Sequence, residues 1–236
     1  MTQTERVLVV GAHSDDVDFS SAGTMIKWAR EGKEIYYLIC TDGDKGGTRN
    51  DLTANELMTV RRAEQEEAAA IVGVKKVFFL GHSDGELVAG QELKKEIVRI
   101  IRQVRPNKVF SFDPGNNSFD GFFLFHSDHR AVAISVFDAI YPAAKNRLYF
   151  PELLSEGLEP HKVQELYMFG SDRPNVCIDI SDVIDLKIKA LRCHRSQFEG
   201  DRADMIEEFV RQRGKNSSND PAIEYAESFR IISFPF

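Results

Sequence analysis

Short apolar segments alternate with longer amphipathic ones through the first half of the chain, and this alternation constrains the fold most. The short segments are rich in β-branched and aromatic residues, which favours buried strands. They are residues 7–10, 34–41, 76–80 and 108–112. The longer segments between them have helical spacing or stop at Gly or before Pro. They are residues 21–30, 55–72 and 92–104.

Strands that alternate with helices indicate a parallel sheet with right-handed crossovers. Two further strands are expected at residues 164–170 and 175–180, and a helix at 182–198. No internal repeat or domain linker stands out. We therefore expect one α/β domain over residues 1–236, with a Rossmann-like, mostly parallel sheet, helices on both faces and an active site at the carboxyl ends of the strands.

Two clusters of His and Asp lie more than a hundred residues apart. Ala12-His13-Ser14-Asp15-Asp16 follows the first strand, and His126-Ser127-Asp128-His129 opens a helix. A catalytic zinc takes three protein ligands and keeps one position open, and His13, Asp16 and His129 meet that need. Asp15 can then face the attacking water as general base. The alternative is a solvated loop that caps the next helix.

The second cluster favours the metal site. His126 and His129 are three residues apart at a helix start, so they share one face. Asp128, between them, can orient a histidine through its ring N–H.

Six motifs in order resemble the PIG-L/LmbE-like family of zinc-dependent N-deacetylases, which act on N-acetylglucosaminyl compounds. Two of them are the His/Asp clusters. The others are Thr41-Asp42-Gly43-Asp44-Lys45-Gly46-Gly47, Arg61-Arg62-x-Glu64 and His194-Arg195-Ser196-Gln197, with Tyr225-Ala226-Glu227-Ser228-Phe229 near the carboxyl end. The resemblance therefore covers nearly the whole chain.

The resemblance implies that His13, Asp16 and His129 bind zinc and that Asp15 is the general base. It also implies that His126 stabilises the oxyanion or protonates the leaving amine while Asp128 holds it. The chain departs from the family at Ser14 and Ser127, where the family has Pro, at Asp18, where it has Glu, and at Leu124, where some members have Tyr.

Three further residues are candidates for substrate binding. Arg49 and Arg62 can contact substrate hydroxyls or an anionic aglycone, although isolated arginines more often form surface ion pairs. His194 is a candidate because its Ser-Gln context matches the family motif.

The composition of the chain narrows the classes of binding partner that we expect. A net charge of −7 argues against nucleic acid, because phosphate-backbone binding needs a basic surface. Cys40, Cys177 and Cys193 are odd in number and widely spaced, so a disulfide framework is not expected. No signal peptide or membrane-spanning run is apparent. We expect a soluble, cytoplasmic protein with a small amino-sugar substrate, and the sequence leaves open whether it forms a homo-oligomer.

The expected function is a hydrolase with one zinc per chain, replaceable by Fe(II) or Co, that removes acetyl from an N-acetylated amino sugar. Three alternatives stay open. An amidase of a cysteinyl-sugar conjugate would use the same residues. A two-metal phosphoesterase would need two ions roughly 3.5–4 Å apart. A sugar-binding protein with structural zinc would normally close the site with four Cys or His ligands.

Overall fold

The computed structural model describes residues 4–47, 51–116, 126–198 and 200–234. It contains a seven-stranded sheet in the order β3-β2-β1-β4-β5-β7-β6. The strands are β1 (Arg6–Gly11), β2 (Glu34–Thr41), β3 (Lys76–His82), β4 (Lys108–Phe112), β5 (Glu165–Phe169), β6 (Val176–Asp179) and β7 (Ala226–Ser233). The predicted α/β class is therefore confirmed.

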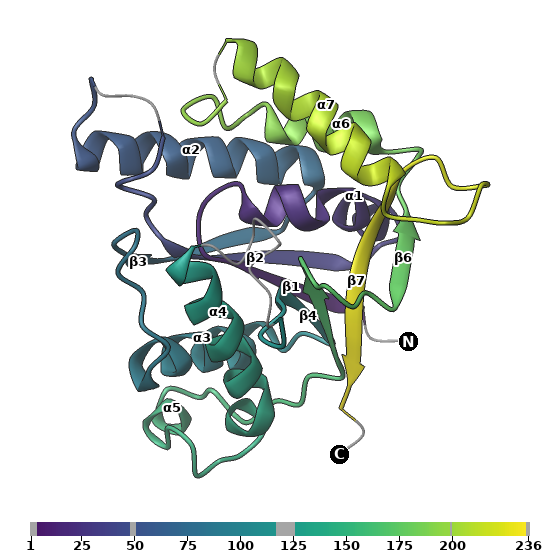
Figure 1. The fold of residues 1–236 in the computed structure, drawn as a ribbon. Coiled ribbons are helices and arrows are strands. Elements are labelled where there is room, and N and C mark those ends of the chain that lie inside the picture. The colour runs from purple at the N-terminus through teal and green to yellow at the C-terminus, as the bar shows by residue number, and fades with distance from the viewer. Residues whose placement is uncertain (1–3, 48–50, 117–125, 199, 235–236) are drawn as a thin grey trace.

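Helices cover both faces of this sheet (Figure 1). On one face lie α1 (Asp16–Arg30), α2 (Ala54–Val72), α6 (Ile184–Leu191) and α7 (Asp201–Lys215). On the other face lie α3 (Gln91–Val104), α4 (Ser127–Asp138), the short η2 (Ala139–Ala144) and α5 (Glu152–Ser155). Within the described ranges, none of these helices has the length and apolar character needed to span a bilayer.

The strand order of the sheet reverses its direction at β1. β1 pairs in parallel with β2 on one side and with β4 on the other, and β5 continues in parallel from β4. β7 then runs antiparallel between β5 and β6. The carboxyl ends of β1 and β4 thus form a topological switch point, the usual ligand site of open α/β sheets.

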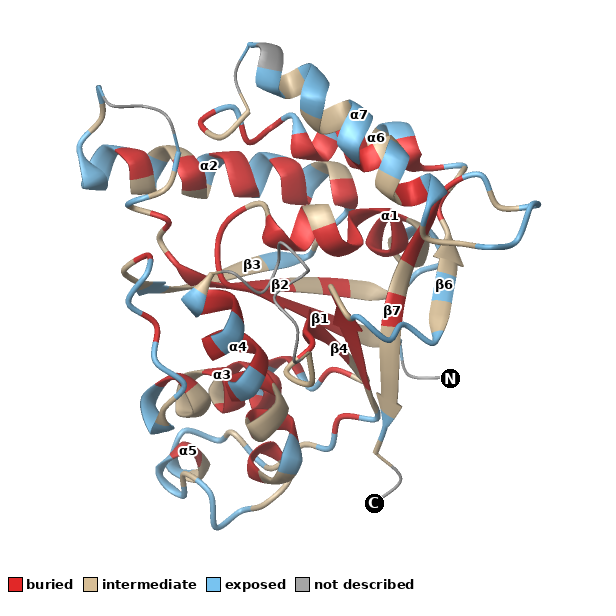
Figure 2. Ribbon diagram, viewed as in Figure 1, coloured by how far each residue is buried: buried red, intermediate tan, exposed pale blue. Residues whose placement is uncertain are grey.

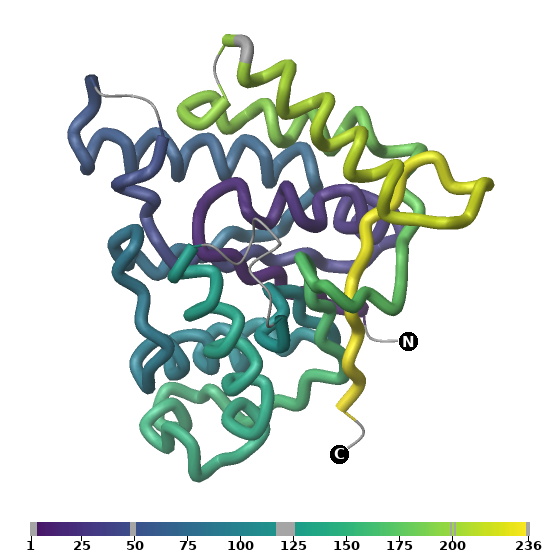
Figure 3. Tube along the Cα trace, viewed as in Figure 1, coloured from purple at the N-terminus to yellow at the C-terminus, as the bar shows by residue number. Residues whose placement is uncertain are grey.

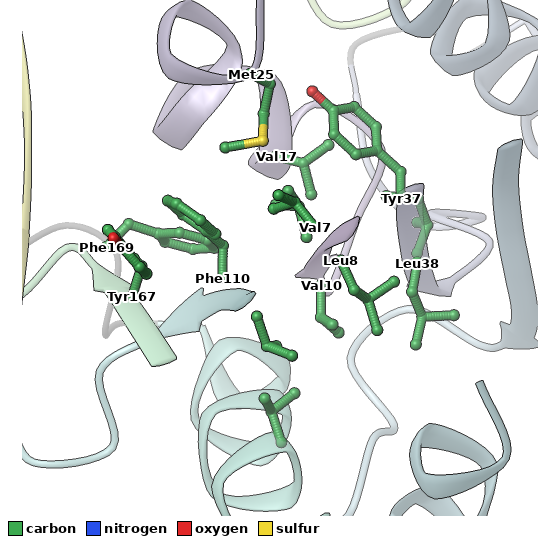
Figure 4. Packing of buried hydrophobic residues seen from close by; sticks show 14 of the residues in the cluster. Val7, Leu8, Val10, Val17, Met25, Tyr37, Leu38, Phe110, Tyr167 and Phe169 are labelled. Carbon is green, nitrogen blue, oxygen red and sulfur yellow. The ribbon is translucent and has the colours of Figure 1, made fainter. Parts of the chain in front are cut away.

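The core is densest around β1. Val7, Leu8, Val9 and Val10 are fully buried, as expected for a strand covered on both faces. Figure 2 shows the same burial along β1 and β4. Successive side chains alternate between the two faces: in Figure 4, Val7 lies toward Val17 and Met25 of α1, whereas Leu8 and Val10 point the other way. α1 packs in turn against α2 and α6, and Figure 3 traces this layer.

Several element boundaries differ from the predictions. α1 begins at Asp16 rather than at residue 21, because the polar residues Asp16 and Asp18 already form its first turn. α6 ends at Leu191 rather than at residue 198, and the His194 motif lies in turns beyond it. α7 and β7 were not expected from the sequence. α2 starts after a Thr53–Glu56 capping box and ends at Gly73, whose φ of 88° suits glycine.

The carboxyl-terminal motif has a structural role. The Glu227 carboxylate in β7 accepts hydrogen bonds from Gly23 N (3.0 Å), Thr24 N (2.8 Å) and Thr24 Oγ1 (2.6 Å). It also pairs with the Lys187 ammonium of α6, and both side chains are almost fully buried. Lys187 donates in addition to the Phe19 carbonyl at 2.6 Å. This buried pair therefore ties β7, α1 and α6 together.

Candidate metal centre

The loop after β1 is held by hydrogen bonds from its backbone to the Asp16 side chain. Asp16 Oδ2 accepts hydrogen bonds from Ala12 N (3.0 Å) and His13 N (2.7 Å), so the carboxylate closes a tight turn before α1. A side chain on Gly11 would come within 2.9 Å of Val17 Cγ1, so the turn needs glycine there. The first cluster is thus fixed at the carboxyl end of β1, as predicted.

The second cluster is fixed by the start of α4. His126 is the N-cap residue, and its Nδ1 accepts a hydrogen bond from Asp128 N at 3.3 Å. One turn into the helix, the His129 ring stacks on Phe112 of β4 with centroids 4.3 Å apart. These contacts direct His129 toward the loop after β1.

Three candidate ligands from the two clusters converge. His13 Nδ1 lies 3.2 Å from His129 Nε2 and 3.4 Å from Asp16 Oδ2, and Asp16 Oδ1 lies 3.2 Å from His129 Nε2. Ligand bonds of 2.0–2.2 Å in a tetrahedron would place ligand atoms about 3.3–3.6 Å apart. The spacing of His13, Asp16 and His129 therefore fits a small divalent ion, and all three side chains are buried.

Three carboxylates surround His13. Although burial opposes its charged form, hydrogen bonds with Asp128, Asp16 and Asp84 raise the pKa of His13 to about 12. The negative potential of these carboxylates, which favours a proton on His13, also favours a bound metal cation. The charge of the pocket and the spacing of its donors thus support the same interpretation.

Asp128 lies on the far side of His13. Its Oδ2 is 3.1 Å from His13 Nε2 but 3.8 Å from His126 Nδ1, too far for a hydrogen bond. Backbone N–H groups of Gly85 (2.7 Å) and Leu87 (3.1 Å) also bind this carboxylate. The Asp128 carboxylate therefore hydrogen-bonds with His13, lies at ion-pair distance from His126, and reaches His126 by a hydrogen bond only through the Asp128 backbone N–H. Its pairing with the His126 side chain, which the resemblance implies, stays a prediction.

Asp84 was missed by the sequence analysis. It follows β3, at the same sheet edge as His13, and its Oδ1 lies 3.1 Å from His13 Nε2 and 3.6 Å from His126 Nε2. Asp44 holds this segment by accepting the Asp84 N–H at 2.7 Å. The signal available in the sequence was its position directly beyond the third strand.

Asp15 lies beside the ligands, in the wall of a cavity of about 390 Å³. Burial raises the pKa of its carboxyl group, while the Arg61 guanidinium, 3.6 Å from Asp15 Oδ2, acts in the opposite direction. The other residues lining the cavity are His13, Asp16, Gly46, Arg61, Asp84, His126, His129 and Gln197.

Two residues that were predicted to contact substrate are not among the residues that line this cavity. Arg62 pairs with Asp42 (Nη2–Oδ1 2.6 Å), and its helical neighbour Arg61 faces the cavity instead. His194 is buried, with Nε2 2.9 Å from Asp18 Oδ2. We therefore assign neither Arg62 nor His194 a substrate contact. Arg49, like Leu124, lies outside the described residues.

A second group of possible donors consists of His13, Asp84, His126 and Asp128. It meets the first group only at His13, whose Nδ1 faces one group and Nε2 the other. Ions on opposite nitrogens of one imidazole would be about 6 Å apart, farther than the 3.5–4 Å of a two-metal phosphoesterase. The geometry thus argues against that alternative.

Residues 8–140, more than half of the chain, match the family described as PIG-L, GlcNAc-PI de-N-acetylase. The chain belongs to the PIG-L family. Its predicted family membership is thereby confirmed, on the segment that carries both His/Asp clusters.

Other proteins resemble this PIG-L chain over most of its length. It is 33% identical over 228 residues to the diacetylchitobiose deacetylase of Thermococcus kodakarensis, covering 97% of this chain and 83% of the relative. The N,N'-diacetylchitobiose deacetylase structure from Pyrococcus horikoshii superposes with a TM-score of 0.90 at 32% identity, covering 98% and 85%. A mycothiol S-conjugate amidase of Streptomyces coelicolor is 29% identical over 196 residues, covering 74% and 64%. These relatives agree with the predicted deacetylase and with the amidase alternative.

Proposed function

We propose that this PIG-L protein is a zinc-dependent hydrolase that removes the acetyl group from an N-acetylated amino sugar. The observation that carries the proposal is the convergence of His13, Asp16 and His129, with ligand atoms 3.2–3.4 Å apart, beside the Asp15 carboxylate. Hard and borderline donors of this kind suit zinc, and Fe(II) or Co would bind to the same set.

A divalent ion on these three residues would polarise the amide carbonyl and activate a water molecule. Asp15 then accepts the proton that the attacking water loses, and that proton passes to the amine nitrogen as the C–N bond breaks, which releases acetate and the amino sugar. Burial raises the pKa of this carboxyl group, which makes Asp15 a stronger base than an exposed aspartate. No serine or cysteine nucleophile is required.

His126 supplies a hydrogen bond to the reacting amide. Because its Nδ1 accepts the Asp128 N–H, the neutral ring carries its proton on Nε2. Burial and the neighbouring His13 lower the pKa of His126, which favours that neutral form. The Nε2–H can then stabilise the negative charge that develops on the amide oxygen.

The substrate class follows from the relatives and the cavity. Two relatives are named as deacetylases of diacetylchitobiose, a sugar that carries N-acetyl groups. Arg61, Asp84 and Gln197 line the cavity with donors and acceptors suited to sugar hydroxyls. We infer an N-acetylglucosaminyl compound as the substrate.

The test combines metal content with product analysis. We expect about one zinc per chain and acetate release from N-acetylglucosamine, diacetylchitobiose or an N-acetylglucosaminyl conjugate, lost on chelation and restored by zinc. Asp15→Asn should keep the metal and lose turnover. Release of a cysteine derivative without acetate would favour the amidase, and two metals without acetate would refute the proposal.

A further inference from the structure

Asp15 has an unusual backbone conformation. Its φ is 90° and its ψ is −35°, whereas a residue with a Cβ rarely adopts positive φ. Positions of this kind persist only where surrounding contacts hold them, and they gather at active sites. Two side chains of α2 hold Asp15 in this conformation.

Both ends of one peptide unit are bound by α2. Arg61 Nη2 donates to the Ser14 carbonyl oxygen at 2.9 Å. Gln65 Oε1 accepts the Asp15 N–H at 3.0 Å. The carbonyl of Ser14 and the N–H of Asp15 belong to the same planar unit, so the two side chains together fix its orientation.

Helical spacing explains why one helix supplies both groups. Arg61 and Gln65 are four residues apart on α2 and therefore share a face, and both side chains are buried. Neither was predicted to be a site residue, although Arg61 opens the Arg61-Arg62-x-Glu64 motif; Gln65 belongs to none of the motifs.

A second contact orients the Gln65 amide. Gln65 Nε2 donates to Asp18 Oδ2 at 2.8 Å, which leaves Oε1 to face the Asp15 N–H. Asp18 Oδ2 also pairs with His194 Nε2 at 2.9 Å. A chain of hydrogen bonds through Asp18 and Gln65 thus connects His194 to the Asp15 backbone. This connection, and not a substrate contact, is the role that we assign to His194.

We propose that Gln65 is a positioning residue that, with Arg61, locks the Ser14–Asp15 peptide so that the Asp15 carboxylate faces the cavity. This inference rests on the proposed role of Asp15 as base. Without the Gln65 acceptor the peptide unit can rotate, and Asp15 relaxes toward negative φ. Asp16 stays in place, because its carboxylate is bound by Ala12 N and His13 N.

The test replaces Gln65 with Met, which has similar length but no hydrogen-bonding amide, in metal-loaded protein. Loss of one hydrogen bond of about 1.4 kcal/mol corresponds to about tenfold faster exchange of the Asp15 amide, measured by NMR on ¹⁵N-labelled protein. We expect kcat to fall about 10- to 100-fold with KM and zinc content unchanged.

Two variants accompany Gln65→Met. Thr24→Val is the matched control, because it removes a buried hydrogen bond to Glu227 elsewhere in α1 and should leave kcat and Asp15 exchange unchanged. Gln65→Leu, which likewise offers no acceptor for the Asp15 N–H, replaces Gln65→Met if that variant fails to fold.

Three outcomes would overturn the inference: wild-type Asp15 exchange in Gln65→Met, loss of zinc in step with activity, or an equal further loss of kcat when Gln65→Met is added to Asp15→Asn. If the wild-type protein releases no acetate, the proposed function fails. The exchange rate of the Asp15 amide still tests the peptide lock in that case.

Discussion

Replacing Glu227 with Gln should destabilise the protein strongly. Glu227 Oε1 accepts from Gly23 N and Lys187, and Oε2 accepts from Thr24 N and Thr24 Oγ1. An amide nitrogen at either position would face donors instead of accepting from them. The Lys187 ammonium, almost fully buried, would also lose its counter-charge.

Removing one partner of a buried ion pair costs about 3–5 kcal/mol, a large part of an ordinary stability of 5–15 kcal/mol. For a chain of this length, that loss lowers Tm by about 10 °C. Lys187→Met should cost less, because Glu227 keeps its bonds from Gly23 and Thr24. The assay is urea unfolding of the metal-loaded protein at pH 7.

The double variant Glu227→Gln/Lys187→Met separates the charge effect from packing. It should be more stable than Glu227→Gln alone, because no unpaired ammonium remains in the interior. A cost below about 1 kcal/mol for Glu227→Gln, or a double variant less stable than that single one, would show that the pair does not hold β7 to α1 and α6 as argued.

Three other predictions concern the metal and pH. Asp16→Ala should abolish stoichiometric metal binding, measured by elemental analysis, because it removes one of three ligands. Asp128→Asn should weaken metal affinity about tenfold in a competition titration with a chelator, because the charge that orients His13 is lost; unchanged affinity would count against that role. His161 is half-buried, with Nε2 2.7 Å from the Pro106 carbonyl oxygen, and this partial burial lowers its pKa, so the unfolded chain takes up the proton more readily. The contribution of His161 to stability is therefore complete above pH 6.5 and declines below it, by at most about 1.4 kcal/mol per pH unit. In urea unfolding from pH 8 to 5, His161→Gln should lose less stability than the wild type; parallel curves would contradict this.

Local patterns account for the strands that were predicted. The segments at 34–41 and 108–112 match β2 and β4 because continuous apolar runs mark strands buried on both faces. α7 escaped notice because it is a largely polar helix on the outside of the α1–α6 layer. β7 was recognised only as a motif, since its antiparallel pairing with β5 and β6 depends on distant partners.

Some residues of the candidate site could likewise be predicted from local sequence patterns, and others could not. His13, Asp16 and His129 stood out because they occur in dense His/Asp clusters. Asp84, Arg61 and Gln65 come from two other segments, and only the packing of β3 and α2 against the first loop brings them to the site. The family resemblance implied His126 as the partner of Asp128, whereas the fold brings His13 closer to that carboxylate, at 3.1 Å against 3.8 Å.

The switch-point arrangement separates two tasks that an evolving enzyme must meet. The groups assigned to bond cleavage lie after the end of β1 and at the start of α4. Arg61 and Gln65 of α2 hold the first of these segments, and substitutions on the buried face of α2 disturb the core. Gly46 and Gln197, by contrast, line the cavity from segments outside the helices and strands. Under the proposed function, substitutions in these segments would change the shape of the cavity without moving His13, Asp16 or His129, so substrate preference could change while the proposed metal centre stays intact.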